Sequence, residues 1–333
     1  MKVRFRLVST KEANTFVLAH SIRFNNLSLK KGRVLNKSDI SDLLKHKITK
    51  IYVAIKSKDD YSENYSAKSI ANHISSSDFH DPIVNNGRAD LFSRKNGMLK
   101  INKEKLFKIN SLYSEIAVCT LKNYSIVKEG QLVGNVKILP YAMNKKKIQK
   151  ILNKNELKRI FKISTVTSSK IALIFTSNNI KNLKKEKVLK AIGDRLKNFN
   201  LKISFSTVCN HNHKDLSLKI KEVLKKNVDL LLIHGESSIC DLNDVVPSGI
   251  LKANGKIMSC LLPTDPGNLL LLGKILKSII IGVPGCAKSL QRNGFDDVLE
   301  RVCHGENFTK TELTNLADGG LYKSIIRKFD TIK

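Results

Sequence analysis

The chain has 333 residues, of which 41% are hydrophobic, and its formal net charge is +30 at pH 7. This length suggests two or three domains, and the hydrophobic content is sufficient for a buried core, so a wholly disordered chain is excluded. No run approaches the roughly 20 uncharged apolar residues that cross a bilayer. Apolar and basic residues alternate from Met1 to Leu7, which fits a strand rather than a signal peptide. We therefore expect a soluble, cytoplasmic protein with no membrane partner.

Lysine supplies most of the positive charge, because 48 of the 59 basic residues are Lys and they are spread along the chain. Nucleic-acid binders concentrate Arg and aromatic side chains on one surface, where guanidinium groups and rings contact phosphates and bases. Here only 6% of the residues are aromatic and Trp is absent. The charge therefore fits a solvated surface better than a specific nucleic-acid interface. A charge-driven, nucleic-acid-associated protein is the alternative that it leaves open.

Residues 1–143 are predicted to form a mixed, β-rich α+β region. The expected elements are a turn into a strand at 30–35, a helix opening at 38, a strand at 51–55, a helix at 67–74, and strands at 116–120 and 133–139. The polar stretch 61–95 is either an insertion or a partly mobile connection. Residues 144–168 begin with a Lys-rich helical pattern and are expected to be a helical linker.

Strands and helices alternate from residue 169 onward. A continuous apolar run, of the kind that parallel sheets bury on both faces, lies at 171–175. Further strands are expected at 228–233 and 278–283, and another begins at 203. Helical patterns lie at 189–196, 216–224, 247–253 and 295–302. This alternation predicts an α/β fold, with a three-layer doubly wound domain over residues 169–333.

Three loops follow or adjoin the predicted strands, namely Gly235–Asp244, Pro263–Asn268 and Pro284–Ser289. Sheets of this kind bind ligands outside the carboxyl ends of their strands. Small residues allow backbone N–H groups to approach a phosphate, and a following helix adds its positive dipole end. The loops also carry hydroxyl donors and a cation, which are Ser237, Ser238, Ser289 and Lys288. The sequence therefore predicts an anion-binding edge.

Residues 170–305 resemble the molybdopterin-binding domain shared by molybdopterin adenylyltransferases and molybdopterin molybdenumtransferases (the MoaB/Mog and MoeA type). The matching stretches are Asp229–Gly235, Asp244–Pro247, Asp265–Asn268 and Ile281–Gly285. Residues 29–40 look like the segment that precedes this domain in the molybdenumtransferases. Residues 136–140 and the overall layout look closest to a bacterial molybdopterin-binding variety.

The resemblance implies a site for the pterin and its terminal phosphate. The residues that it implies for binding are Gly235, Ser237, Ser238, Asp265, Gly267, Asn268, Pro284, Gly285, Lys288 and Ser289. It also implies that Asp244 holds Mg²⁺ or takes part in catalysis. Glu236 is a candidate metal ligand or general base, and its alternative is a solvent-facing loop residue. Asp244 has the alternative of a helix N-cap.

Two departures from the family's pattern bear on function. The family's first loop opens with two glycines, whereas Glu236 follows Gly235 here. The molybdenumtransferases flank the Pro-Gly of the second loop with lysines, and here Asp265 and Asn268 take those places. We therefore expect molybdopterin binding in molybdenum-cofactor biosynthesis, as a molybdenumtransferase-like protein or as a non-catalytic carrier or scaffold. Other cofactor-biosynthesis proteins and a second copy of the chain are the expected partners.

Two further groups favour a structural interpretation. The run Cys209–His213 resembles a metal cluster, but alternate spacing on a loop suits few tetrahedral sites. The six cysteines lack zinc-knuckle and redox-dithiol spacing, which favours reduced thiols. His234 at a strand end is expected to be a neutral, hydrogen-bonded histidine rather than a catalytic one. No Ser/His/Asp triad follows from spacing alone.

Overall fold

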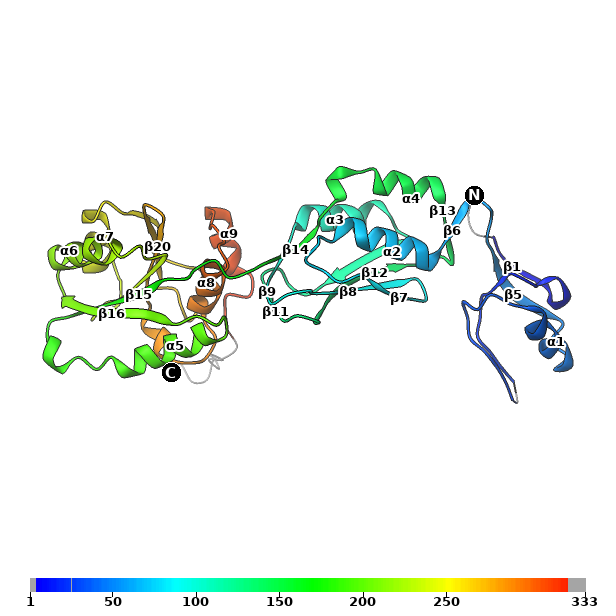
Figure 1. Cartoon of the computed structure of the whole chain (residues 1–333), viewed down its shortest axis with the longest axis horizontal. Coiled ribbons are helices and arrows are strands. Elements are labelled where there is room, and N and C mark those ends of the chain that lie inside the picture. The colour runs from blue at the N-terminus through cyan, green and yellow to red at the C-terminus, as the bar shows by residue number, and fades with distance from the viewer. Residues whose placement is uncertain (1–3, 25, 323–333) are drawn as a thin grey trace, which may run out of the picture. The chain divides into compact units, whose positions relative to one another are not determined.

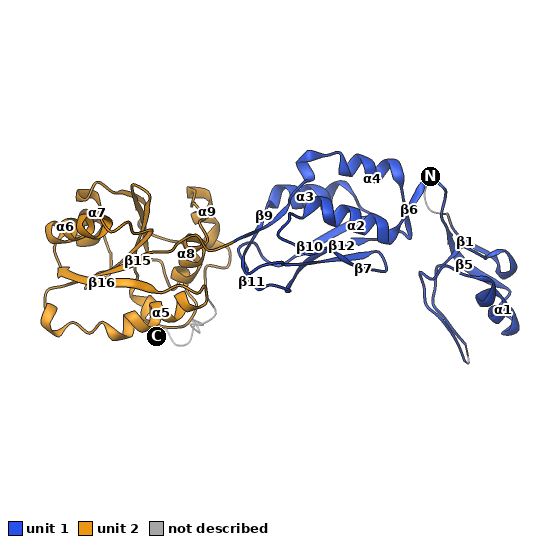
Figure 2. Ribbon diagram, in the orientation of Figure 1, with its two compact units in different colours: residues 1–164 blue, residues 165–333 orange. Residues whose placement is uncertain are grey.

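The computed structural model describes residues 4–24 and 26–322, and the chain divides into two compact units, 1–164 and 165–333 (Figures 1 and 2). None of the helices within the described ranges has the length and apolar character needed to cross a membrane.

Unit 1 opens with a small antiparallel sheet in the order β1-β5-β2. Its elements are β1 (Arg4–Ser9), β2 (Val17–Leu18), β5 (Lys50–Ile55), the hairpin β3 (Ile22–Phe24) and β4 (Leu27–Leu29), and helix α1 (Lys37–Lys45). A capping box starts α1, because the Asn36 side chain accepts the Asp39 N–H and the Asp39 side chain accepts the Asn36 N–H. The expected helix and the strand at 51–55 are confirmed. At 30–35 there is a turn, but Val34 forms only an isolated bridge with Val17.

The rest of unit 1 has a larger antiparallel sheet in the order β10-β12-β8-β7 and a second in the order β11-β9-β14. Its strands are β6 (Asp60–Ser62), β7 (Ile83–Asn85), β8 (Arg88–Phe92), β9 (Gly97–Ile101), β10 (Ile116–Thr120), β11 (Ile126–Val127), β12 (Leu132–Ile138), β13 (Ala142–Asn144) and β14 (Phe161–Ser164). Its helices are α2 (Glu63–Ile74), α3 (Lys103–Leu112) and α4 (Lys145–Leu152). Ile70 and Ile74 of α2 are fully buried in one core with Leu91 and Val136 of the larger sheet. The stretch 61–95 is therefore part of the core rather than a mobile connection.

The segment 144–168 does not form the expected linker. Ile148 and Ile151 of α4 are fully buried in the core of unit 1. β14 pairs antiparallel with β9, placing Phe161 opposite Ile101. The chain therefore stays inside unit 1 as far as residue 164, because two apolar helix positions and a complete strand are needed to close that core.

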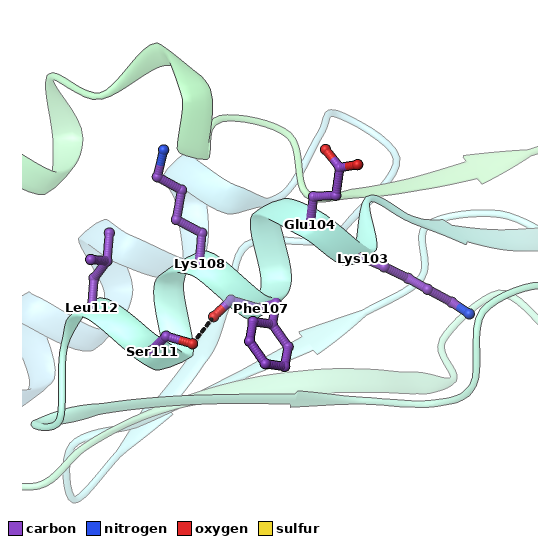
Figure 3. A pocket seen from close by; sticks show the side chains of 6 residues that line it. All are labelled: Lys103, Glu104, Phe107, Lys108, Ser111 and Leu112. Atoms are coloured by element: carbon purple, nitrogen blue, oxygen red, sulfur yellow. Dashed lines mark hydrogen bonds between the residues drawn. The ribbon is translucent and has the colours of Figure 1, made fainter.

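Helix α3 has one buried and one exposed side. Ile109 is fully buried, whereas Phe107 is 77% exposed and helps to line a cavity of about 620 Å³. Figure 3 shows Phe107 beside Ser111, whose hydroxyl donates to the Phe107 carbonyl oxygen at 2.8 Å. Lys103 and Lys108 point away from each other in the same view. Polar groups do not converge on this face as they do in a small-molecule site.

Unit 2 contains a six-stranded sheet in the order β16-β15-β17-β20-β19-β18. Its strands are β15 (Ile171–Ser177), β16 (Ile203–Asn210), β17 (Leu230–His234), β18 (Lys256–Ser259), β19 (Leu271–Ile275) and β20 (Ser278–Gly282). Its helices are α5 (Glu186–Lys197), α6 (His213–Leu224), α7 (Val245–Lys252), α8 (Gly294–Cys303) and α9 (Lys310–Thr314). Neighbours among β16, β15, β17 and β20 are parallel, whereas β19 and β18 are antiparallel. The predicted α/β class is confirmed, and β18 and β19 are additions to the expected elements.

Consecutive residues of the central strands face opposite helices. Leu173 belongs to one core with residues of α5 and α8, and Ile174 belongs to another with residues of α6 and α7. All seven residues of β15 are buried. Because both faces of the central strands are buried, their sequences are mostly apolar and do not alternate between apolar and polar residues.

Two helical glycines of unit 2 allow a matched test of packing. A Cβ added at Gly249 would lie 2.7 Å from Leu216 Cδ2, whereas one added at Gly193 meets nothing within 4 Å. We expect Gly249→Ala to lower the free energy of unfolding by about 1–3 kcal/mol through overpacking of α7 against α6. We expect Gly193→Ala to raise it by about 0.5–1 kcal/mol through helix propensity. Urea denaturation of the full chain measures both, and equal effects of the two variants would contradict the close α6–α7 contact.

Candidate functional site

The three predicted loops lie at one edge of the sheet of unit 2. The carboxyl ends of β15, β16, β17 and β20 share this edge because these strands are parallel. β19 runs the other way, with Leu271 opposite Gly282, so its amino end lies at the same edge. Gly235–Asp244 follows β17, Pro284–Ser289 follows β20, and Pro263–Asn268 precedes β19.

Neighbouring groups show that the loops approach one another. A Cβ built at Gly285 would lie 3.8 Å from Ser238 Oγ. Burial, and after it the charges of Asp244 and Asp241, raise the pKa of the Cys260 thiol just ahead of the second loop. The first loop is therefore in direct reach of the third and within electrostatic reach of the start of the second.

A chain of hydrogen bonds ends at Ser237. The Glu236 N–H donates to Thr176 Oγ1 at 3.3 Å, and Thr176 Oγ1 lies 2.7 Å from His211 Nδ1. His211 Nε2 in turn lies 3.1 Å from Ser237 Oγ. Thr176 is in β15, and His211 directly follows β16. We call Thr176, His211 and Ser237 the hydroxyl–imidazole relay.

Burial of Thr176 sets the direction of this relay. Thr176 is only 1% exposed, so its hydroxyl hydrogen needs an acceptor inside the protein. If that hydrogen goes to His211 Nδ1, the ring carries its own proton on Nε2 and donates to Ser237 Oγ. The reverse direction leaves the Thr176 hydrogen without an acceptor among the residues described. The relay therefore ends in a Ser237 hydroxyl whose hydrogen can be donated to a ligand.

The two candidate catalytic carboxylates both accept backbone N–H groups. Glu236 Oε2 accepts from the Asn178 N–H, which follows β15. Asp244 Oδ2 accepts from the N–H groups of Cys240 at 2.6 Å and Asp241 at 3.0 Å. Asp244 occupies the N-cap position of α7, but its side chain makes no capping hydrogen bond with that helix. Both carboxylates therefore hold the conformation of the first loop and its neighbour.

The described side chains at this edge do not form a group of three metal ligands. Within residues 4–24 and 26–322, no three His, Cys, Asp or Glu side chains gather in a group that could hold a metal ion. The geometry gives no support to the expected Mg²⁺ at Asp244. The run Cys209–His213 is no exception, since burial raises the pKa of Cys209 to about 11 and disfavours the thiolate that binds metals.

Arg195 of α5 holds the third loop. Its side chain is 6% exposed and pairs with Asp296 of α8 through Nε at 2.7 Å. Nη1 donates to the Ala287 carbonyl oxygen at 2.9 Å, and Nη2 donates to that of Ser289 at 2.6 Å. Pro284 is buried, while Gly285, Lys288 and Ser289 are exposed. A buried cation thus fixes the loop from within and leaves its outer residues accessible.

The second loop is completed by the C-terminal segment. The Asp265 N–H donates to the Gly320 carbonyl oxygen at 2.8 Å, and the Tyr322 N–H donates to the Asp265 carbonyl oxygen at 3.0 Å. Gly267 has φ +118°, and a Cβ there would lie 2.7 Å from the Gly294 nitrogen, so only glycine fits. Asp265 and Asn268 line a cavity of about 440 Å³ together with this segment.

The edge is acidic although the chain is strongly basic. The three loops contain four carboxylates, Glu236, Asp241, Asp244 and Asp265, and a single lysine, Lys288. Lys288 also acts on the neighbouring strand end, because burial first and then its charge lower the pKa of His234 to about 4. A neutral His234 agrees with the expectation from the sequence.

The sequence analysis did not single out Thr176, and it considered His211 only as part of a possible metal cluster. Both lie at the ends of neighbouring parallel strands, where Thr176 pairs with Cys209 in the register of β15 and β16. The available signal was the polar run that ends each apolar strand, at Thr176–Asn179 and Asn210–His213.

No family model matches the chain, and no curated protein matches it in sequence. Among solved structures, the tungsten cofactor synthesizing protein MoaB from Pyrococcus furiosus is 13% identical, with a TM-score of 0.31, and the match covers 46% of this chain and 98% of that one. The molybdopterin biosynthesis Mog protein from Mycobacterium ulcerans is 15% identical, with a TM-score of 0.30, and the match covers 41% of this chain and 97% of that one. The molybdopterin biosynthesis moeA protein from Pyrococcus horikoshii OT3 is 10% identical, with a TM-score of 0.27, and the match covers 94% of this chain and 76% of that one. Likenesses this low do not assign the chain to a family.

Protonation of His234 is expected to destabilise the protein in acid. Its pKa of about 4 in the folded state lies below the ordinary value of 6.5, so the unfolded state binds the proton more readily. Between pH 7 and pH 4 the wild type should lose up to about 3 kcal/mol more unfolding free energy than His234→Gln does. Urea denaturation at both pH values measures the difference, and identical pH dependence of the two proteins would refute it.

Arg195→Met is expected to release the third loop. It leaves the Asp296 carboxylate and two loop carbonyl groups without their buried partner, which should cost about 3–5 kcal/mol of unfolding free energy. Lys197→Met on the same helix is the control, since Lys197 is 77% exposed in its ion pair and should contribute at most about 1 kcal/mol. Adding Asp296→Asn to Arg195→Met should recover part of the loss. Thermal and urea unfolding compare the variants, and similar stabilities of the two single variants would count against the clamp.

Proposed function

We propose that unit 2 binds molybdopterin at the carboxyl edge of its sheet and acts in molybdenum-cofactor biosynthesis. The observation that carries this proposal is the convergence of Gly235–Asp244, Pro263–Asn268 and Pro284–Ser289 at one edge. These are the loops whose sequences resemble the molybdopterin-binding domain. A three-layer doubly wound domain of that type is part of the same proposal.

The phosphate of the ligand is proposed to lie between the first and third loops. Ser237, Ser238, Lys288 and Ser289 are all exposed there and supply three hydroxyl donors and one cation. The relay supports this assignment because it directs the Ser237 hydroxyl as a donor. Gly235 leaves room for the loop to turn, since a Cβ there would lie 2.8 Å from the Ser237 carbonyl oxygen.

The pterin ring is proposed to reach the second loop. A pterin presents an amino group and ring N–H groups, which are donors that a carboxylate accepts. Asp265 and Asn268 offer acceptor oxygens beside the cavity of about 440 Å³. An acidic edge with a single lysine therefore suits a ligand that combines a donor-rich ring with one phosphate better than it suits a polyphosphate.

A carrier or scaffold is the form of this function that the carboxylates support. Glu236 and Asp244 both accept backbone N–H groups, and the described part of the chain holds no group of three His, Cys, Asp or Glu side chains for a metal ion. A molybdenumtransferase-like reaction would require Asp244 to exchange these partners for a metal. Binding requires no such rearrangement.

Retention of pterin tests the proposal directly. The protein is expressed in a host that makes molybdopterin, purified in high salt and oxidised, and pterin fluorescence is measured. The wild type should carry about one pterin per chain, and Gly235→Asp should carry none, because its side chain has no room and adds a negative charge beside the phosphate. Thr176→Val should reduce the bound pterin about tenfold by breaking the relay, while Thr176→Ser keeps the hydroxyl and the pterin.

A host protein known to bind molybdopterin serves as the positive control. If the control retains pterin and the wild type carries none, the proposed ligand is wrong. If the wild type and Thr176→Val carry equal amounts, binding stands and the role of the relay is wrong.

A further inference from the structure

A polar cavity of about 480 Å³ lies in unit 1 at the carboxyl end of α2. Its lining combines the loop that follows α2 with one residue after β8 and two residues ahead of β14. The charged and titratable side chains that line it are His73, His80, Asp81, Arg94, Lys158 and Arg159. We call it the basic cavity. Three serines in a row, 75–77, add hydroxyl groups.

Positive charge dominates this lining. Arg94, Lys158 and Arg159 are permanent cations, and in the described part of the chain none of them forms an ion pair. Asp81 is the single carboxylate among the lining residues. The nearby Asp78 is already neutralised, since Lys95 Nζ lies 2.6 Å from its Oδ1. One cation would suffice to complement the partial negative charge at the end of α2, so the cavity keeps an excess of positive charge.

Hydrogen bonds to the backbone hold the main chain of both arginines and the guanidinium of Arg94. Arg94 donates its N–H to the Asp78 carbonyl oxygen at 2.8 Å and its Nε to that of Phe79 at 3.2 Å. The Arg159 N–H donates to the His73 carbonyl oxygen at 3.2 Å. Arg159 is thus anchored to the last turn of α2, and Arg94 to the middle of the loop that follows this helix.

The pKa of His73 reflects the same excess of positive charge. Burial first, and then the charges of Lys158 and Lys105, lower the pKa of this ring. Its Nε2 lies 3.2 Å from the Lys154 carbonyl oxygen, which partly opposes the shift. A neutral imidazole beside uncompensated cations leaves the positive charge available to an anion.

We propose that the basic cavity binds the phosphate group of a small phosphorylated molecule. Two guanidinium groups can bind phosphate oxygens in pairs, and the hydroxyls of Ser75 and Ser77 can bind the remaining oxygens. Ser76 Oγ already donates to Asp78 Oδ2 at 2.9 Å. The volume lies within the range of small-molecule sites. This site is separate from the edge of unit 2, where carboxylates outnumber lysine, and it does not depend on the function proposed there.

Calorimetric titration of the full chain with pyrophosphate and with inorganic phosphate, in about 150 mM NaCl, tests the site. We expect saturable binding of one pyrophosphate per chain. Arg94→Gln and Arg159→Asn should each weaken it about tenfold by removing one charged fork. Arg159 has φ +52°, a conformation that Asn adopts readily, so this variant should fold as well as the wild type. The ring signals of His73 should shift on titration in the wild type.

Arg23→Gln is the matched control, because Arg23 is an exposed cation of the same unit in β3. It removes the same charge from the chain and should leave pyrophosphate affinity unchanged. Equal weakening by all three variants would show diffuse attraction and overturn the proposal. A single-stranded oligonucleotide that binds with the same variant profile would also overturn it, because the cavity would then bind a nucleic-acid backbone rather than a small molecule. The absence of saturation up to about 10 mM pyrophosphate would overturn it as well. Pterin retention should be equal in all of these variants.

Discussion

The parallel pairing of β15, β16, β17 and β20 determines where the candidate binding loops of unit 2 can lie. Each parallel connection has to cross a face of the sheet, so helices cover both faces and the carboxyl ends stay open. The reversal at β19 then adds the second loop, Pro263–Asn268, because Leu271 pairs with Gly282 at that edge. With a parallel β19, the preceding residues Pro263–Asn268 would lie at the opposite edge. One reversal of strand direction therefore brings the Asp-Pro-Gly-Asn motif to the other loops.

Charge is distributed differently in the two units, and the net charge of +30 conceals this. Glu236 and Asp244 lie at the edge of unit 2, where backbone N–H groups compensate their charges and the carboxylates in return fix the loops. Hydrogen bonds to the charged form stabilise a carboxylate without a metal or a lysine. Arg94 and Arg159 line the cavity of unit 1, where no comparable compensation exists among the described residues. Whether a charged side chain fixes the structure or can bind a ligand therefore depends on its local partners and not on the net charge of the chain.

The central strands of unit 2 and α2 were predictable because each carries its own pattern. The apolar runs at 171–175 and 230–233 are long enough to require burial, whatever surrounds them. The end of unit 1 was not predictable in this way. The apolar face of α4, with Ile148 and Ile151, does not specify which core it joins. The partner of β14 is β9, some sixty residues earlier in the chain. Likewise, the contact between Thr176 and His211 depends on the register of β15 and β16, which no local pattern specifies.

Asp244 illustrates how a residue can be recognised in sequence while its role is not. Its position ahead of a helix predicts an N-cap, and it does occupy that position in α7. Its carboxylate nevertheless accepts the N–H groups of Cys240 and Asp241 from its own loop. A cap would stabilise α7 alone, whereas this arrangement ties the loop to the helix start and fixes its path past Gly285. The constraint on Asp244 is therefore the shape of the candidate loop edge, and a substitution that caps α7 equally well would still lose that shape.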